Sequence, residues 1–151
     1  MTPVPQTNYG RHQGNCLTAC IASVLDVPIS SVPEFCVDGE WFARLDAFCR
    51  ENGFFLLYWR HSENIPLICL NAYVILLLAL EGESDLHAVV ARTTIESKEP
   101  ITDAEIERGA ALAEDAGGIR WGWKSELVHD PNERGYPPVE GVRGYIMIGK
   151  Q

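Results

Sequence analysis

An unbroken apolar run near the middle of the chain, Ala72 to Leu80, limits the folds that the sequence can adopt. A run of this length is consistent with a strand buried on both faces, and it is too short for a membrane-spanning helix. The turn-forming stretch 81–85 follows it. The next apolar run, 86–93, is therefore expected to pair with it as a β-hairpin.

Apolar residues at helical spacing predict two helices ahead of this hairpin. The first covers about 16–26, with Asn15 as its N-cap, and the second runs from Trp41 to a C-cap near Asn52-Gly53. Further strands are predicted at 54–59, 127–130 and 144–148, and loops at 94–100 and 132–141. Helices followed by hairpin-linked strands favour an α+β fold, with an antiparallel sheet packed against the first helix.

The length of 151 residues fits a single domain covering 1–151. Within it, 94–125 is a candidate insertion, since it contains an acidic helix expected from Asp103 to about Ala116. The net charge of −9 argues against a nucleic-acid-binding face. The opening Met-Thr-Pro-Val-Pro lacks the pattern of a signal peptide, and the five cysteines, an odd number, predict reduced thiols in the cytoplasm.

Cys16 is the leading candidate for a nucleophile. It lies where the loop Gln13-Gly-Asn15 becomes the first helix. The unpaired N–H groups of a first helical turn favour negative charge, which suits a reactive thiolate. Cys20, one turn later, falls within the apolar stripe of the helix and is expected to lie in the core.

A thiol nucleophile needs an imidazole base and a group that orients it. His87 opens a predicted buried strand, which would hold the ring rigidly, and Asp130 of the pair Asp130-Pro131 is the candidate orienting carboxylate. His129 is ranked below His87 because strand alternation directs it to the other face. His12 is a weaker base because its loop is expected to be flexible.

The oxyanion of an acyl-transfer intermediate needs hydrogen-bond donors. The backbone N–H of Cys16 is one candidate, and the side-chain amide of Gln6 is preferred over that of Gln13 as the second. A zinc site built from His12, Cys16, Cys20 and His129 is an alternative use of these residues. We expect no metal or cofactor, because the second ligand pair that is typical of structural zinc is missing.

The sequence around these residues resembles the papain-like cysteine peptidases. Gly14-Asn15-Cys16, His87-Ala-Val-Val and Asp130-Pro131, with Gln6 upstream, are most similar to the double-glycine leader peptidases of bacteriocin exporters and their small stand-alone relatives in bacteria and phages. The resemblance implies a Cys-bearing helix on an antiparallel sheet that carries the His and the Asp. It also implies that Cys16 is the nucleophile, His87 the base, Asp130 the orienting residue and Gln6 the oxyanion donor.

The resulting hypothesis is a papain-like cysteine hydrolase that cleaves a peptide, isopeptide or side-chain amide bond. Its partner would be a peptide or protein substrate, with no nucleic acid or membrane involved. The rival hypothesis is a catalytically inactive binding module on the same scaffold, which would sequester a host protein or a small ligand.

Overall fold

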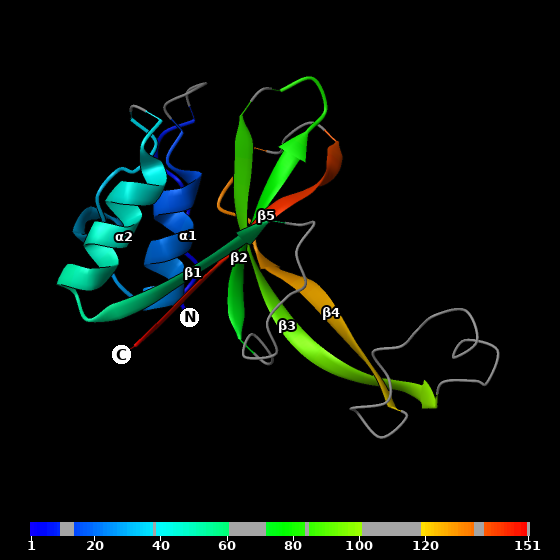
Figure 1. The fold of residues 1–151 in the computed structure, drawn as a ribbon. Helices are drawn as coiled ribbons and strands as arrows, with labels where there is room; N and C mark the ends of the chain where they lie inside the picture. The colour runs from blue at the N-terminus through cyan, green and yellow to red at the C-terminus, as the bar shows by residue number, and fades with distance from the viewer. Residues whose placement is uncertain are drawn as a thin grey trace.

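The computed structural model describes residues 1–9, 14–37, 39–60, 72–83, 85–100, 119–134 and 138–150, and of 94–100 and 119–125 it describes the backbone. Two α-helices and a short 3-10 helix precede five strands in the described chain (Figure 1). The elements are α1 (Cys16–Leu25), η1 (Ile29–Ser31), α2 (Trp41–Glu51), β1 (Phe54–Arg60), β2 (Tyr73–Leu80), β3 (Leu86–Pro100), β4 (Ile119–His129) and β5 (Val139–Lys150).

The five strands form one antiparallel sheet in the order β1-β5-β2-β3-β4. Both helices lie on the same side of this sheet (Figure 1), where α1 packs mainly against β3 and α2 against β1. The predicted α+β class, with an N-terminal helix against an antiparallel sheet, is therefore confirmed.

The helix-facing side of the sheet carries the larger of two apolar clusters. Alternate residues of the strands, such as Ile75, Val90 and Ile146, pack there against Leu17, Cys20 and Ile21 of α1 and against Leu45 and Cys49 of α2. Fully burying an aliphatic side chain of this size contributes about 1.5–3 kcal/mol. This cluster fixes the position of α1 on the sheet, and with it the position of Cys16.

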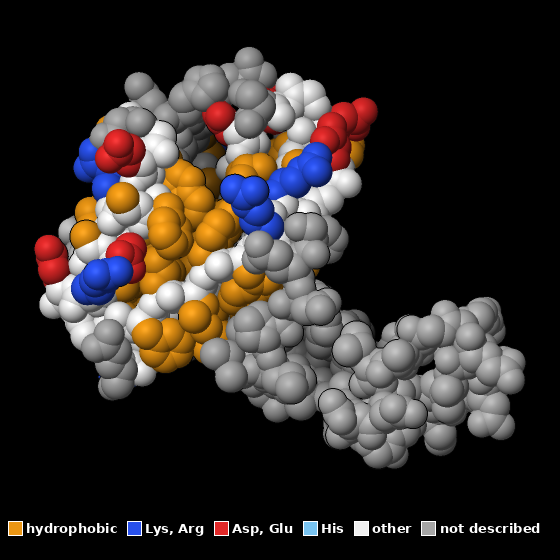
Figure 2. Space-filling model, in the orientation of Figure 1, with side chains coloured by type: hydrophobic (Ala, Val, Ile, Leu, Met, Phe, Trp, Pro, Cys, Tyr) orange, Lys and Arg blue, Asp and Glu red, His pale blue; other side chains and the backbone are white. Residues whose placement is uncertain are grey.

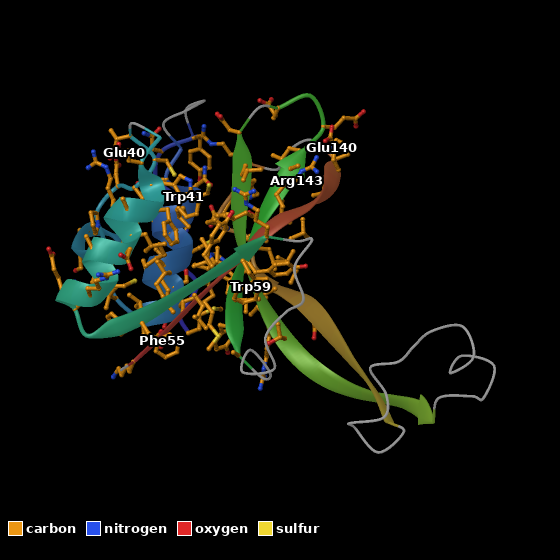
Figure 3. All side chains as sticks on the ribbon, in the orientation of Figure 1. Glu40, Trp41, Phe55, Trp59, Glu140 and Arg143 are labelled. Atoms are coloured by element: carbon orange, nitrogen blue, oxygen red, sulfur yellow. The ribbon has the colours of Figure 1, made fainter. Side chains whose placement is uncertain are left out.

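The opposite side of the sheet carries the second cluster. Its members come from the alternate strand positions, among them Leu76, Val89 and Tyr145, and all of these are buried. The rings of Trp59 (labelled in Figure 3) and Tyr145 stack with centroids 5.5 Å apart. Burial on both faces explains why β2 is an unbroken apolar run, as the sequence predicts.

Glycines terminate two elements where the sequence places them. Gly53 has φ 73° immediately after α2, and Gly82 has φ 72° in the turn between β2 and β3. A residue without Cβ adopts this left-handed region at little cost. The helix boundaries and the β2–β3 hairpin therefore agree with the predicted ones.

The later strands are longer than the sequence indicates. Residues 94–100, predicted as a loop, continue β3, and they pair with 119–124 of β4. The predicted loop 132–141 is likewise wrong at its end, because β5 already begins at Val139. In Figure 1, β3 and β4 extend beyond the rest of the sheet as a two-stranded ribbon. The acidic helix predicted for 103–116 lies outside the described residues.

Hydrophobic side chains reach the surface where α2 meets β1. The rings of Trp41, Phe42 and Tyr58 contact one another there with centroid distances of 5.5–5.6 Å, and Phe42 and Tyr58 are exposed. Figure 2 shows hydrophobic side chains gathered on this side of the molecule. None of the described helices has the length and apolar character needed to cross a membrane.

Candidate active site

Cys16 is the first residue of α1, and its side chain is partly exposed. The next seven residues of the helix, 17–23, are all buried. The helix is therefore anchored along its first two turns, while the thiol at its start stays within reach of a ligand. Helix geometry leaves the first backbone N–H groups, including that of Cys16, without partners inside the helix.

Strand pairing brings Asp130 to His87. Val90 on β3 pairs with His129, the last residue of β4, so Asp130 falls beside the start of β3. His87 Nε2 and Asp130 Oδ1 are 2.9 Å apart. The same carboxylate oxygen accepts a hydrogen bond of 2.8 Å from the backbone N–H of Asn132, which fixes its orientation. Asp130 thus both forms a turn and faces the imidazole.

Cys16 lies close enough to the His87 side chain to contribute to the pKa of the ring. Since Nε2 faces Asp130, Nδ1 is the ring nitrogen left for the sulfur. Burial lowers the pKa of His87, but the hydrogen bonds and charges of Cys16 and Asp130 outweigh it, so the pKa is raised above its usual value. The structure therefore brings three of the predicted residues together.

Gln6 lies next to the turn that contains Asp130 and next to the start of α1. Its backbone N–H donates to the carbonyl of Pro131, which follows Asp130, at 3.0 Å. Its side-chain Nε2 donates to the carbonyl of Asn8 at 3.2 Å, and Oε1 is buried with no hydrogen-bond partner among the described residues. The alternative oxyanion residue, Gln13, lies outside the described residues.

Asn15 is the N-cap residue of α1, as the sequence predicts, but its side chain makes no capping hydrogen bond. Its Oδ1 instead accepts hydrogen bonds from the backbone N–H groups of Thr7 and Asn8, both at 3.0 Å. Its Nδ2 donates to the Thr7 hydroxyl at 2.9 Å. The side chain faces the N-terminal arm, residues 1–8, and makes no hydrogen bond with the first-turn N–H groups of α1.

The other described cysteines differ from Cys16 in their surroundings. Cys20 is fully buried, as expected, and burial followed by the charges of Cys16 and Asp130 raises its pKa. Burial, with the charge of Asp46, raises the pKa of Cys49 to about 11. Cys36 exposes much of its surface, yet local burial and the charges of Cys16 and Asp85 raise its pKa to about 11. These three thiols are protonated at neutral pH.

The residues of the zinc alternative are only partly described. His129 Nε2 lies 2.9 Å from the carbonyl oxygen of Val4, and His12 lies outside the described residues. Among the side chains that the structure describes, no group of three His, Cys, Asp or Glu residues is placed to hold a metal ion.

The comparisons give no relative for this chain. No protein-family model matches it, and neither a curated protein nor a solved structure gives a significant match.

Sequence reasoning missed the contacts of the N-terminal arm with this site. They are made largely by main-chain groups, such as the Asn8 and Pro131 carbonyls, which have no residue-type signal. The one available signal is the polar, buried Asn15 directly before the thiol, whose amide needs partners.

Proposed function

We propose that the protein is a cysteine hydrolase of papain-like type, acting on an amide bond of a peptide or protein substrate in the cytoplasm. The observation that carries the proposal is that His87 Nε2 lies 2.9 Å from Asp130 Oδ1, while Cys16 is near enough to help raise the pKa of the same ring. A partly exposed thiol at a helix start completes the constellation that thiol-dependent acyl transfer requires. The free thiols of all described cysteines fit a reducing compartment.

The chemistry follows from the positions of the groups. The Cys16 sulfur attacks the carbonyl carbon and forms a C–S bond, while the carbonyl oxygen becomes an oxyanion. The His87 imidazolium then gives its proton to the leaving nitrogen as the C–N bond breaks, which leaves a thioester. Water, deprotonated by His87, attacks the thioester, releases the acid and restores the thiol.

The fold supports the same assignment. A Cys-bearing helix packed on an antiparallel sheet that carries His87 and Asp130 is the arrangement that the resemblance to papain-like peptidases implies. The buried amide of Gln6 next to the helix start supports its role as an oxyanion donor, together with the N–H of Cys16.

Limited alkylation tests the nucleophile. Native protein is treated with a substoichiometric amount of iodoacetamide at neutral pH, and the five thiols are compared by peptide mass spectrometry. We expect Cys16 to be alkylated first. Preferential alkylation of Cys20, Cys36 or Cys49 would contradict the assignment.

Acyl transfer is tested separately with p-nitrophenyl acetate. We expect a burst of nitrophenolate of one equivalent per chain, absent in Cys16→Ala, and an acetylated Cys16 in the trapped protein. The rival binding module makes the opposite prediction, because a binder whose thiol has no chemical role gives no burst and keeps its activity in Cys16→Ala.

A further inference from the structure

The side chain of Asn15 joins the N-terminal arm to the start of α1. It makes three hydrogen bonds with Thr7 and Asn8, and its own backbone N–H donates to the Asn8 carbonyl at 3.2 Å. Only 6% of the residue is exposed, so water competes little for these bonds. The arm is therefore held to the residue that directly precedes the thiol.

The same arm carries Gln6. The Gln6 side chain and the Asn15 backbone N–H share one acceptor, the carbonyl of Asn8. The Gln6 amide thus lies within two hydrogen-bond lengths of the backbone nitrogen of Asn15. At the other end, the Gln6 N–H is bound to Pro131, beside Asp130. Asn15 and Pro131 together fix the arm on both sides of the Gln6 side chain.

Asn15 also leaves the helix start open. A Ser, Thr, Asn or Asp at this position normally accepts hydrogen bonds from N–H groups of the first turn. Here both acceptor interactions of Oδ1 go to the arm, and the side chain makes no capping bond. The side chain of Asn15 therefore does not occupy the first-turn N–H groups, which can bind a negatively charged oxygen.

We infer that Asn15 is a positioning residue for the oxyanion site. It acts through Gln6, by holding the arm at a fixed place relative to the Cys16 N–H, and it does not itself contact the substrate. This inference rests on the proposed function. It concerns the acyl-transfer step and not the formation of the thiolate, so the two can be measured apart.

Two reagents separate these steps. Alkylation of Cys16 by iodoacetamide is a displacement at a saturated carbon and forms no oxyanion, whereas acylation by p-nitrophenyl acetate passes through a tetrahedral oxyanion. Loss of one oxyanion donor slows acyl transfer by about 10²–10³-fold. We expect Gln6→Ala to slow acylation of Cys16 by about 10²-fold and to leave its alkylation rate within about twofold.

Three substitutions at Asn15 remove or keep different hydrogen bonds between its side chain and the arm. Asn15→Ala removes all side-chain bonds to the arm. Asn15→Ser is too short to reach the arm, and its hydroxyl can cap the N–H of the second or third residue of α1, which keeps the helix start folded and leaves the Cys16 N–H to the oxyanion. Both are expected to slow acylation at least about tenfold with alkylation within about twofold. Asn15→Asp keeps the acceptor for both N–H groups, and the Thr7 hydroxyl can turn to donate, so acylation should recover to within about threefold of wild type.

A double-mutant cycle tests whether Asn15 acts through Gln6. We expect Gln6→Ala/Asn15→Ser to acylate at the rate of Gln6→Ala alone. Asn52→Ala serves as the matched control, since Asn52 caps α2 through the Phe48 carbonyl, and it should change neither rate.

The outcomes are distinct. Unchanged acylation in Asn15→Ser, an equal loss of alkylation and acylation, or additive effects in the cycle would each overturn the positioning role while leaving the hydrolase proposal in place. A wild-type protein that is neither alkylated selectively at Cys16 nor acylated by the ester would overturn both.

Discussion

His87 and Asp130, separated by 43 positions in the chain, are joined by a contact of 2.9 Å between Nε2 and Oδ1. The contact depends on the antiparallel pairing of β3 with β4, which ends at the Val90–His129 pair. It determines the orientation of the ring. With Nε2 held by the carboxylate, Nδ1 is the ring nitrogen left to interact with Cys16, which is the arrangement that the proposed reaction needs.

Asp130→Asn tests the electrostatic part of this contact. The amide keeps an oxygen for His87 and Asn132 but loses the negative charge, so the raised pKa of His87 should fall. Acylation of Cys16 is expected to slow by about 10²-fold or more, since the imidazolium is less stable. The pKa is measured by NMR titration of the His87 ring. An unchanged pKa would contradict the role of the charge.

The same variant should alter the pH dependence of stability. Because the pKa of His87 is raised in the folded state, its interaction with Asp130 stabilises the protein fully below the unfolded value of about 6.5 and is lost as pH rises through the folded pKa. The difference in Tm between wild type and Asp130→Asn should therefore be larger at about pH 5 than at about pH 8.5. Glu133→Gln, an exposed neighbour, is the control and should show no such change.

His87→Gln tests whether the imidazole activates the sulfur of Cys16. At about pH 6 a thiol without such a partner is almost entirely protonated. Alkylation of Cys16 at that pH is expected to fall by about tenfold or more in the variant, and to approach the wild-type rate above about pH 9. A variant that keeps the wild-type rate at low pH would show that another group activates the sulfur.

The surface thiol of Cys36 provides an internal reference for the alkylation experiments. Burial and the charges of Cys16 and Asp85 raise its pKa to about 11. Its alkylation should be slow at neutral pH and should keep increasing with pH beyond about 9. A Cys36 that reacts as fast as Cys16 at neutral pH would contradict the assigned difference between the two thiols.

The helices and the β2–β3 hairpin could be predicted because local signals agree there. Helical spacing and Gly53 define α2, and the apolar run of β2 ends at a turn with Gly82. The extensions of β3, β4 and β5 could not be predicted in the same way. Residues 94–100 are polar, and their strand conformation depends on pairing with 119–124, which are distant in the chain.

The residues of the candidate site likewise divide into those that the sequence could indicate and those that it could not. Cys16, His87 and Asp130 carry reactive groups in recognisable local settings, so the sequence could nominate them. The role of Asn15 could not be read in this way, because a polar residue before a helix predicts a cap. In the structure, Oδ1 of Asn15 accepts hydrogen bonds from the N–H groups of Thr7 and Asn8 and not from the first turn of α1. Which donor binds it depends on the path of the arm, and no local rule specifies that path.

Ser23 should contribute to holding the arm at its far end. Its hydroxyl is fully buried, donates to the Ala19 carbonyl at 2.8 Å and accepts from the N–H of Val4 at 2.9 Å. Ser23→Ala leaves the Val4 N–H without this acceptor, which is expected to lower the free energy of unfolding by about 1–3 kcal/mol. Chemical denaturation measures the loss, with exposed Ser31→Ala as the control. Since Val4 precedes Gln6 on the arm, Ser23→Ala should also slow ester acylation more than alkylation of Cys16, and an equal loss of both rates would show that the arm does not serve the oxyanion site.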